Sequence, residues 1–218
     1  MMKALVALLS HIIDAIAPLR ERTRRVRTTD AEDLALSPTV HDLLGTRITT
    51  LMNYESGGSA ALIQSLKYDG SARAARLLAS ALADFLREEV ASHRTFSTKT
   101  LLLVPVPLHP SRGRERGFNQ IQKVLDHLPL EFRDGSLSFV NSETLERTRS
   151  TLPQTKLARS ERLSNVAGAF ACHDEDTIRD THIFLIDDVT TTGATLVNAA
   201  TPLRRAGATV TCLALARA

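Results

Sequence analysis

Two adjacent carboxylates followed by a hydroxyl-rich turn are the residues of this chain best suited to chemistry. An apolar run, residues 183–186, ends at Asp187 and Asp188. Three threonines and a glycine then precede a helical pattern that begins at about residue 194, namely Thr190, Thr191, Thr192 and Gly193. Carboxylates accept hydrogen bonds from sugar hydroxyls, and the first backbone N–H groups of a helix attract anions. The segment therefore predicts a pocket for a sugar that carries a phosphate. The alternative is a plain turn and helix cap, for which Asp and Thr are also suited.

The elements that must position these residues alternate between strands and helices. Continuous apolar runs at 101–106 and 183–186, with a weaker one at 209–215, are typical of strands buried on both faces. Helical spacing extends over 59–90 and is broken at Tyr68, Asp69 and Gly70, and further helices are expected at 119–128 and 194–206. This order predicts an α/β domain with a parallel sheet covered by helices. The carboxyl end of the strand at 183–186 is then the expected ligand edge.

Composition excludes several classes of protein. The chain has 218 residues, 43% hydrophobic and 23% charged, which is typical of a globular protein rather than a disordered or fibrous one. A net charge of +3 is too small for a protein that mainly coats nucleic acid. Cys172 and Cys212 are expected to be buried and reduced, and no apolar run is long enough for an ordinary membrane span. We expect a cytoplasmic protein.

The segment 183–195 resembles the phosphoribosyl pyrophosphate signature of type I phosphoribosyltransferases. The resemblance implies that Asp187 and Asp188, the candidate catalytic residues, hold the ribose 2′ and 3′ hydroxyls. It also implies that the following loop wraps the 5′-phosphate, with Thr190, Thr191, Thr192, Gly193, Ala194 and Thr195 as the phosphate-binding residues. Mg²⁺, held mainly by substrate oxygens, is the implied cofactor.

Two further blocks, residues 101–120 and 147–170, resemble those of ComF-type competence proteins, a branch of the same superfamily. Leu66, Lys67, Tyr68 and Gly70 form a third, shorter match. The residues expected to hold pyrophosphate or to form a small hood over the pocket are Arg112, Arg114, Arg116, Arg147, Gln154 and Arg162. Guanidinium groups suit bidentate phosphate contacts, although a solvated basic loop is the alternative for 112–116. His109 lies beside this loop and is more simply explained as structural.

The N-terminal part departs from the family pattern. ComF-type proteins commonly carry a four-cysteine zinc module, whereas residues 19–58 contain no cysteine, so no zinc is expected. A short helix ending near Pro18 is predicted instead. An arginine cluster follows, either a solvated linker or a phosphate-binding arm: Arg20, Arg22, Arg24, Arg25 and Arg27. We expect two parts, an N-terminal extension over 1–58 and a phosphoribosyltransferase-like domain over 59–218.

Three functions remain open from the sequence. The first is a phosphoribosyltransferase of the ComF family, whose acceptor base the sequence does not identify. The second is a non-catalytic module that binds phosphate or single-stranded DNA; the resemblance implies DNA uptake and a helicase partner. The third is a housekeeping nucleobase phosphoribosyltransferase. Thr191 stands where purine-salvage relatives use an acidic residue, which makes purine salvage the less favoured acceptor class. Many relatives dimerise, so a homodimer is expected.

Overall fold

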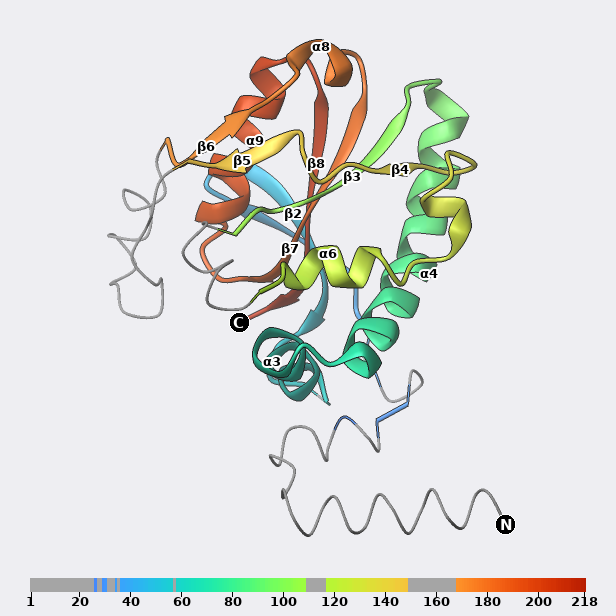
Figure 1. The fold of residues 1–218 in the computed structure, drawn as a ribbon, viewed down its shortest axis with the longest axis vertical. Coiled ribbons are helices and arrows are strands. Elements are labelled where there is room, and N and C mark those ends of the chain that lie inside the picture. The colour runs from blue at the N-terminus through green and yellow to red at the C-terminus, as the bar shows by residue number, and fades with distance from the viewer. Residues whose placement is uncertain are drawn as a thin grey trace, which may run out of the picture.

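A six-stranded sheet with the order β1-β2-β8-β7-β3-β4 forms the centre of the molecule (Figure 1). The computed structural model describes residues 26, 29, 30, 34, 36–56, 58–108, 117–148 and 168–218. The strands are β1 Thr39–Leu43, β2 Thr46–Asn53, β3 Leu101–Pro105, β4 Phe139–Val140, β7 His182–Thr190 and β8 Thr209–Arg217. All neighbours pair in parallel except β1 and β2, which are antiparallel. The predicted α/β class with a mostly parallel sheet is confirmed.

Helices cover both faces of this sheet. Along the chain they are α3 Ser59–Asp69, α4 Ala72–Phe96, α6 Gln120–Leu125, the 3-10 turn η2 Leu130–Phe132, α8 Glu175–Ile178 and α9 Ala194–Arg205. In Figure 1, α3, α4 and α6 lie on one side of the sheet and α9 lies on the other. No helix within the described ranges is both long and apolar enough to cross a membrane.

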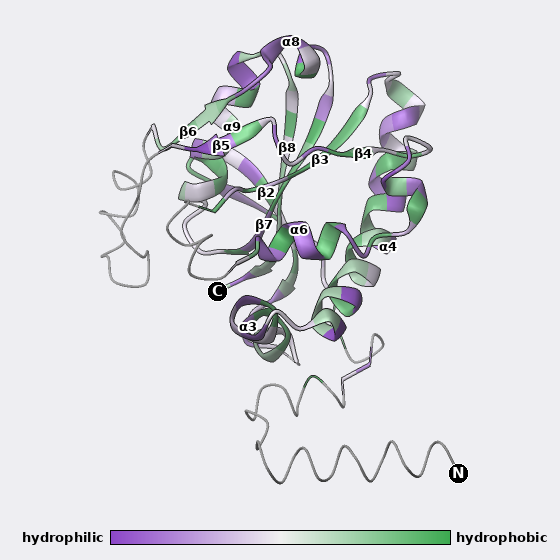
Figure 2. Ribbon diagram, in the orientation of Figure 1, coloured by the Kyte–Doolittle hydropathy of each residue, from purple (hydrophilic) through white to green (hydrophobic). Residues whose placement is uncertain are grey.

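Alternate residues of the central strands supply two separate cores. Phe184 and Ile186 of β7 pack with α3, α4 and α6, whereas Ile183 and Leu185 pack with α9. All four are at most 1% exposed, as expected for a strand that is buried on both faces. Figure 2 shows the apolar residues gathered along these strands and the polar residues on the outer surfaces of the helices.

One predicted boundary is confirmed and two others differ. The helical pattern over 59–90 forms two helices, as predicted, and Gly70 ends the first of them with φ of 58° while its N–H donates to the carbonyl of Ser65. Strand β7 continues to Thr190, beyond the predicted end at 186, because β8 offers backbone partners to Asp187, Val189 and Thr190. Helix α6 is shorter than the predicted 119–128 and begins after Asn119, which caps it.

The N-terminal segment contributes two strands that the sequence analysis did not assign. Strands β1 and β2 form a hairpin, and β2 pairs with β8 in the main sheet. The sheet therefore extends to the N-terminal side of the boundary predicted at residue 58. Residues 1–25 and 27, which include the predicted helix and the arginine cluster, lie outside the described residues.

A separate two-stranded antiparallel ribbon flanks the main sheet. It consists of β5 Leu145–Arg147 and β6 Phe170–Cys172, and the chain between them carries the predicted hood, residues 149–167, which lie outside the described residues. Cys212 is buried as predicted, but Cys172 at the end of β6 is only half-buried.

Candidate functional site

The acidic pair lies near the carboxyl end of β7, where two helices approach the strand. Successive strand residues point to opposite faces of a sheet, and Asp187 and Asp188 differ in their surroundings accordingly. Asp188 is 5% exposed and points toward α3 and α6, whereas Asp187 is half-buried. In Figure 1, α3 and α6 lie beside this end of the sheet. The strand thus presents two carboxylates in two different environments.

Both carboxylate oxygens of Asp188 have protein partners. Lys67 of α3 places its Nζ 2.9 Å from Oδ1 of Asp188. Gln120, the first residue of α6, donates from Nε2 to Oδ2 at 2.6 Å in a buried hydrogen bond. The lysine side chain is itself only 21% exposed. A buried carboxylate needs a counter-charge and hydrogen bonds to remain ionised, and Asp188 has both.

Asp187 has fewer contacts and a perturbed pKa. Its Oδ1 accepts the backbone N–H of Asp188 at 2.8 Å. Burial, followed by the negative charge of Asp188, raises the pKa of Asp187 to about 7, although the N–H of Asp188 and the charges of Lys67 and Arg147 oppose the rise. A carboxyl group with such a pKa, at the carboxyl end of a parallel strand, is typical of a ligand site.

The predicted phosphate loop connects β7 to the start of α9. Thr190 is buried at the end of β7, Thr191 and Thr192 are half-exposed, and α9 begins at Ala194. The Ala194 N–H points to the hydroxyl of Thr192, at 3.4 Å, and Thr195 lies in the first turn of the helix. A turn of this kind combines hydroxyl groups with the positive end of a 12-residue helix, as a phosphate site requires.

Gly193 is required at its position for two reasons that the structure makes explicit. Its φ is 80°, a left-handed conformation that favours glycine. A Cβ at this position would lie 2.8 Å from Cβ of Leu43 and 2.8 Å from Cδ1 of Ile48, so the β1–β2 hairpin contacts the turn directly. The sequence analysis attributed this glycine to the approach of a phosphate, but the observed close neighbours are hairpin side chains.

The described residues on either side of the predicted pyrophosphate arginines are joined by a hydrogen bond. Asn119 donates from Nδ2 to the carbonyl of Val106 at 3.0 Å, and its Oδ1 accepts the N–H of Ile121 at 2.9 Å. The residue before it, Phe118, lies against Gly70, where a Cβ would be 3.1 Å from the ring. Arg112, Arg114 and Arg116, with His109, lie between Val106 and Asn119, in residues 109–116, outside the described residues.

Arg147 is the one predicted hood residue that the structure describes. It ends β5, is 7% exposed, and its guanidinium lies 5.3 Å from the centre of the Phe170 ring on β6. Its charge acts on Asp187, so β5 carries a cation to the same site. Gln154 and Arg162 fall within 149–167, outside the described part of the chain.

Curated proteins named for DNA utilization and competence are similar to this chain in sequence. DNA utilization protein YhgH of Escherichia coli (strain K12) is 33% identical over 164 residues, which cover 74% of this chain and 67% of that protein. Competence protein ComFC of Streptococcus pneumoniae (strain ATCC BAA-255 / R6) is 32% identical over 142 residues, covering 65% of this chain and 55% of that protein. The chain belongs to the YhgH/ComF family. The match to YhgH of Salmonella typhi, 35% identical over 133 residues, spans 60% of this chain and only 56% of that relative.

Two other comparisons add little to this membership of the YhgH/ComF family. No family model matches the chain. A phosphoribosyltransferase from Corynebacterium diphtheriae has a TM-score of 0.35 and 19% identity over 71% of this chain and 78% of that one. This likeness is too low to support an argument.

Lys67 and Gln120 are the site residues to which the sequence analysis gave no role. Both fall within blocks that resemble the YhgH/ComF family, and that resemblance was the available signal. Their contacts with Asp188 could not be inferred from spacing, because the residues are 121 and 68 positions away from it (188 − 67 and 188 − 120).

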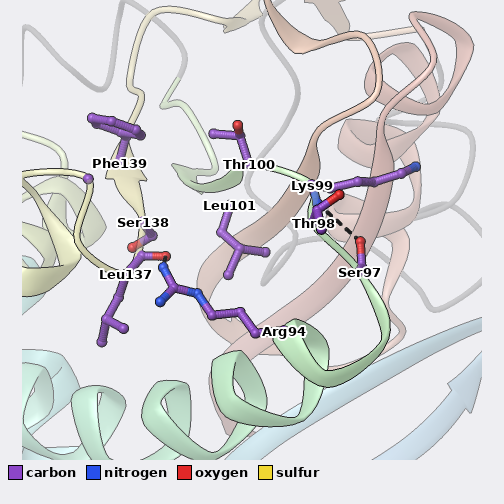
Figure 3. A pocket seen from close by; sticks show the side chains of 10 residues that line it. Arg94, Ser97, Thr98, Lys99, Thr100, Leu101, Leu137, Ser138 and Phe139 are labelled. Carbon is purple, nitrogen blue, oxygen red and sulfur yellow. Dashed lines mark hydrogen bonds between the residues drawn. The ribbon is translucent and has the colours of Figure 1, made fainter.

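A hollow of about 440 Å³ lies where β3 begins, at the end of the strands opposite to the acidic pair (Figure 3). Arg94 there donates to the carbonyls of Ser136 and Leu137, at 2.5 and 3.3 Å. Lys99 extends away from Arg94 and donates to Thr209 at 3.1 Å. Helix α4 ends beside the hollow with its negative pole, which disfavours an anion.

Proposed function

We propose that the carboxyl end of β7 binds phosphoribosyl pyrophosphate together with Mg²⁺, and that this protein is a ComF-type phosphoribosyltransferase that acts in DNA uptake. One observation carries the proposal. A carboxylate with a raised pKa, Asp187, is followed within six residues by a hydroxyl-rich turn at the N-terminus of α9. A phosphoribosyl group carries vicinal hydroxyls and a 5′-phosphate on one sugar, so one ligand offers a partner to each feature.

The ribose is expected to lie against Asp187, whose carboxylate accepts hydrogen bonds from vicinal hydroxyls. The phosphate is expected to lie against the backbone of residues 191–195, with hydroxyls of Thr191, Thr192 and Thr195 around it. Arg147 brings a positive charge from β5 toward the same carboxylate, and Arg112, Arg114 and Arg116 are the further candidates for the pyrophosphate.

Magnesium fits this site as a partner of the substrate rather than as a resident ion. Within the described ranges no three His, Cys, Asp or Glu side chains come together to hold a metal. Asp187 offers a single carboxylate, an oxygen ligand that could add to an ion already bound mainly by phosphate oxygens and water. When bound, Mg²⁺ would neutralise the charge of the leaving pyrophosphate.

The transfer itself demands positioning and electrostatic stabilisation. The bond from the ribose C1′ to pyrophosphate breaks while a bond from C1′ to the acceptor forms, and positive charge develops on the ribosyl group. Asp187 lies where its negative charge can stabilise that cation, and the arginines can hold the pyrophosphate. No covalent nucleophile is needed for such a step.

Thermal unfolding tests this proposal. Phosphoribosyl pyrophosphate with Mg²⁺ at about 100 times its Kd adds about 2.7 kcal/mol to the stability. For a chain of this size the Tm is expected to rise by roughly 5 to 11 °C. Asp187→Asn should abolish the rise, whereas Asp176→Asn, at an aspartate with a 93% exposed side chain on α8, should retain it. An unchanged Tm of the wild type at saturating ligand would refute the proposal.

The names of the relatives favour DNA as a partner, and we propose single-stranded DNA. Those relatives are called DNA utilization and competence proteins, and the chain carries three alternating arginines at 112, 114 and 116. Arg114→Gln/Arg116→Gln is expected to weaken DNA binding and to flatten its dependence on salt, as measured by fluorescence anisotropy between 50 and 200 mM salt. An unchanged affinity and salt slope would remove these arginines from a DNA contact.

A further inference from the structure

The two carboxylates of the acidic pair differ in how much of each is available to a ligand. Asp188 already has Lys67 on Oδ1, at 2.9 Å, and Gln120 on Oδ2, at 2.6 Å, and it is 5% exposed. Asp187 is half-buried, and its hydrogen bond from the N–H of Asp188 uses Oδ1 alone. Among the described residues, Oδ2 of Asp187 has no hydrogen-bond donor. A ribose hydroxyl therefore finds an oxygen without a donor on Asp187, whereas each oxygen of the nearly buried Asp188 already has a protein partner.

Displacing the partners of Asp188 would be unfavourable. A buried carboxylate that loses its ammonium partner keeps an uncompensated charge, which costs more than a neutral hydroxyl returns by hydrogen bonding. Gln120 would also lose its acceptor in a buried position. The ion pair and the amide contact are thus expected to remain in place when a ligand binds.

We infer that the two aspartates have different roles, and we call this the division of roles. Asp187 alone contacts the ribose, whereas Asp188 is a positioning residue that joins α3 and α6 to β7 through Lys67 and Gln120. This inference rests on the proposed phosphoribosyl site. It differs from the expectation in the sequence analysis, in which both carboxylates hold ribose hydroxyls.

What Asp188 positions can be followed along the chain. Gln120 begins α6, and the preceding Asn119 fastens the end of the 109–116 loop to Val106 at the end of β3. On the other side of Asp188, the turn after α3 is joined to α6, because Lys123 Nζ donates to the carbonyl of Gly70. Asp188 therefore lies within a set of contacts that joins α3, α6 and the end of β3 to β7.

A double-mutant cycle between Lys67 and Asp188 tests this division of roles. The four proteins are the wild type, Lys67→Met, Asp188→Asn and the double variant, and the readout is the Kd for phosphoribosyl pyrophosphate with Mg²⁺, by calorimetry well below each Tm. Each single change is expected to raise the Kd by about tenfold or more, because the shared link is broken. The double variant is expected to bind no more weakly than the weaker single variant, within about twofold.

Three outcomes would overturn the inference while leaving the proposed function intact. Binding by Lys67→Met that equals or exceeds that of the wild type would mean that Lys67 competes with the ribose for Asp188. Multiplying losses in the double variant would mean that each side chain contacts the ligand by itself. Failure of Lys67→Arg to restore binding at least partly would mean that the ion pair is not what matters. Absence of binding by the wild type would overturn the proposed function and this inference together.

Stability of the ligand-free protein provides a second readout. Lys67→Met and Asp188→Asn are expected to lower the Tm by similar amounts and without additivity, since both break the same buried contact. Asp187→Asn is expected to abolish binding without lowering the Tm. Lys99→Met, a lysine at the opposite end of the strands, is the matched control and should change neither quantity appreciably. A fall in the Tm of Asp187→Asn as large as that of Asp188→Asn would contradict the division of roles.

Discussion

Replacement of Gly193 by alanine should separate two costs that coincide at the start of α9. The first is conformational, because a residue with a side chain at φ of 80° loses about 1–2 kcal/mol. The second is steric, because the new Cβ would lie 2.8 Å from atoms of both Leu43 and Ile48, far inside normal contact. Forcing an extra carbon into a packed site costs about 1–3 kcal/mol. We expect Gly193→Ala to lose about 2–5 kcal/mol in all.

Gly117→Ala is the matched control for this experiment. Gly117 has φ of 75°, close to that of Gly193, but a Cβ there would have no heavy atom of the described residues within 4 Å. Its replacement should therefore cost only the conformational part, about 1–2 kcal/mol. Urea unfolding measures both, and with m of about 2 kcal/mol/M a steric excess of about 2 kcal/mol lowers the midpoint by about 1 M relative to the control.

A third variant tests the steric contact with Ile48 directly. Ile48→Val deletes the Cδ1 atom that the new Cβ would strike, so Gly193→Ala/Ile48→Val should lose less than the sum of the two single changes. Equal midpoints for Gly193→Ala and Gly117→Ala would refute the reasoning, as would strict additivity with Ile48→Val. Either result would return Gly193 to the role of a glycine needed for its backbone conformation alone.

Three further predictions concern other parts of the molecule. Asp187→Asn should raise the Tm of the ligand-free protein at pH 8. Burial and the charge of Asp188 raise the pKa of Asp187 to about 7, so the folded state holds a proton that the unfolded state releases. The stability of the wild type therefore falls as pH rises toward 7, and asparagine removes this loss. Calorimetry at pH 6 and 8 should show the gain shrinking at the lower pH, and a larger gain there would contradict the sign. Burial, then the charges of His93 and Lys99, lowers the pKa of His182 to about 4, so stability should decline by about 2 kcal/mol as pH falls from 6.5 to 4, and His182→Gln should flatten that decline in urea titrations. Asn119→Ala should lower the urea midpoint by an amount equivalent to about 2 kcal/mol, since it removes a helix cap and the bond to Val106; an unchanged midpoint would show that neither contact stabilises the fold.

The central strands could be predicted because their sequence pattern has one physical meaning. An apolar run such as 183–186 needs cover on both faces, which a parallel sheet between helices provides. The helix end at Gly70 could also be predicted, because glycine adopts the positive φ of a helix end without the strain that other residues have there. These features depend on the local chain alone.

The β1–β2 hairpin could not be read in this way. Its turn places Leu44 at φ of 56° before Gly45 at 71°, whereas the usual signal for such a turn is Asn-Gly or Asp-Gly. β1 is an edge strand whose residues are mostly exposed or half-buried, so it lacks a continuous apolar run. Its place in the sheet is set by contacts between β2 and β8, which are far apart in the sequence.

The candidate site was likewise predictable only in its local part. The carboxylates and the threonine turn are contiguous, and their chemistry can be read from residue types. The ion pair of Asp188 with Lys67 and its hydrogen bond from Gln120 depend instead on the packing of α3 and α6 against β7. The distinction between the two aspartates is a tertiary property that no local pattern carries.

The order of strands also has a consequence for how the chain acquires its fold. Strands β2 and β3 are made early, yet they lie on opposite sides of β8 and β7, which come last in the chain. The two halves of the sheet therefore have no partner for each other until residues 182–217 have been synthesised and inserted between them. Sheets built from such distant segments fold slowly and expose unpaired edges meanwhile. Because the same late segment carries both aspartates, a nascent chain can acquire the proposed site only in the step that closes the sheet.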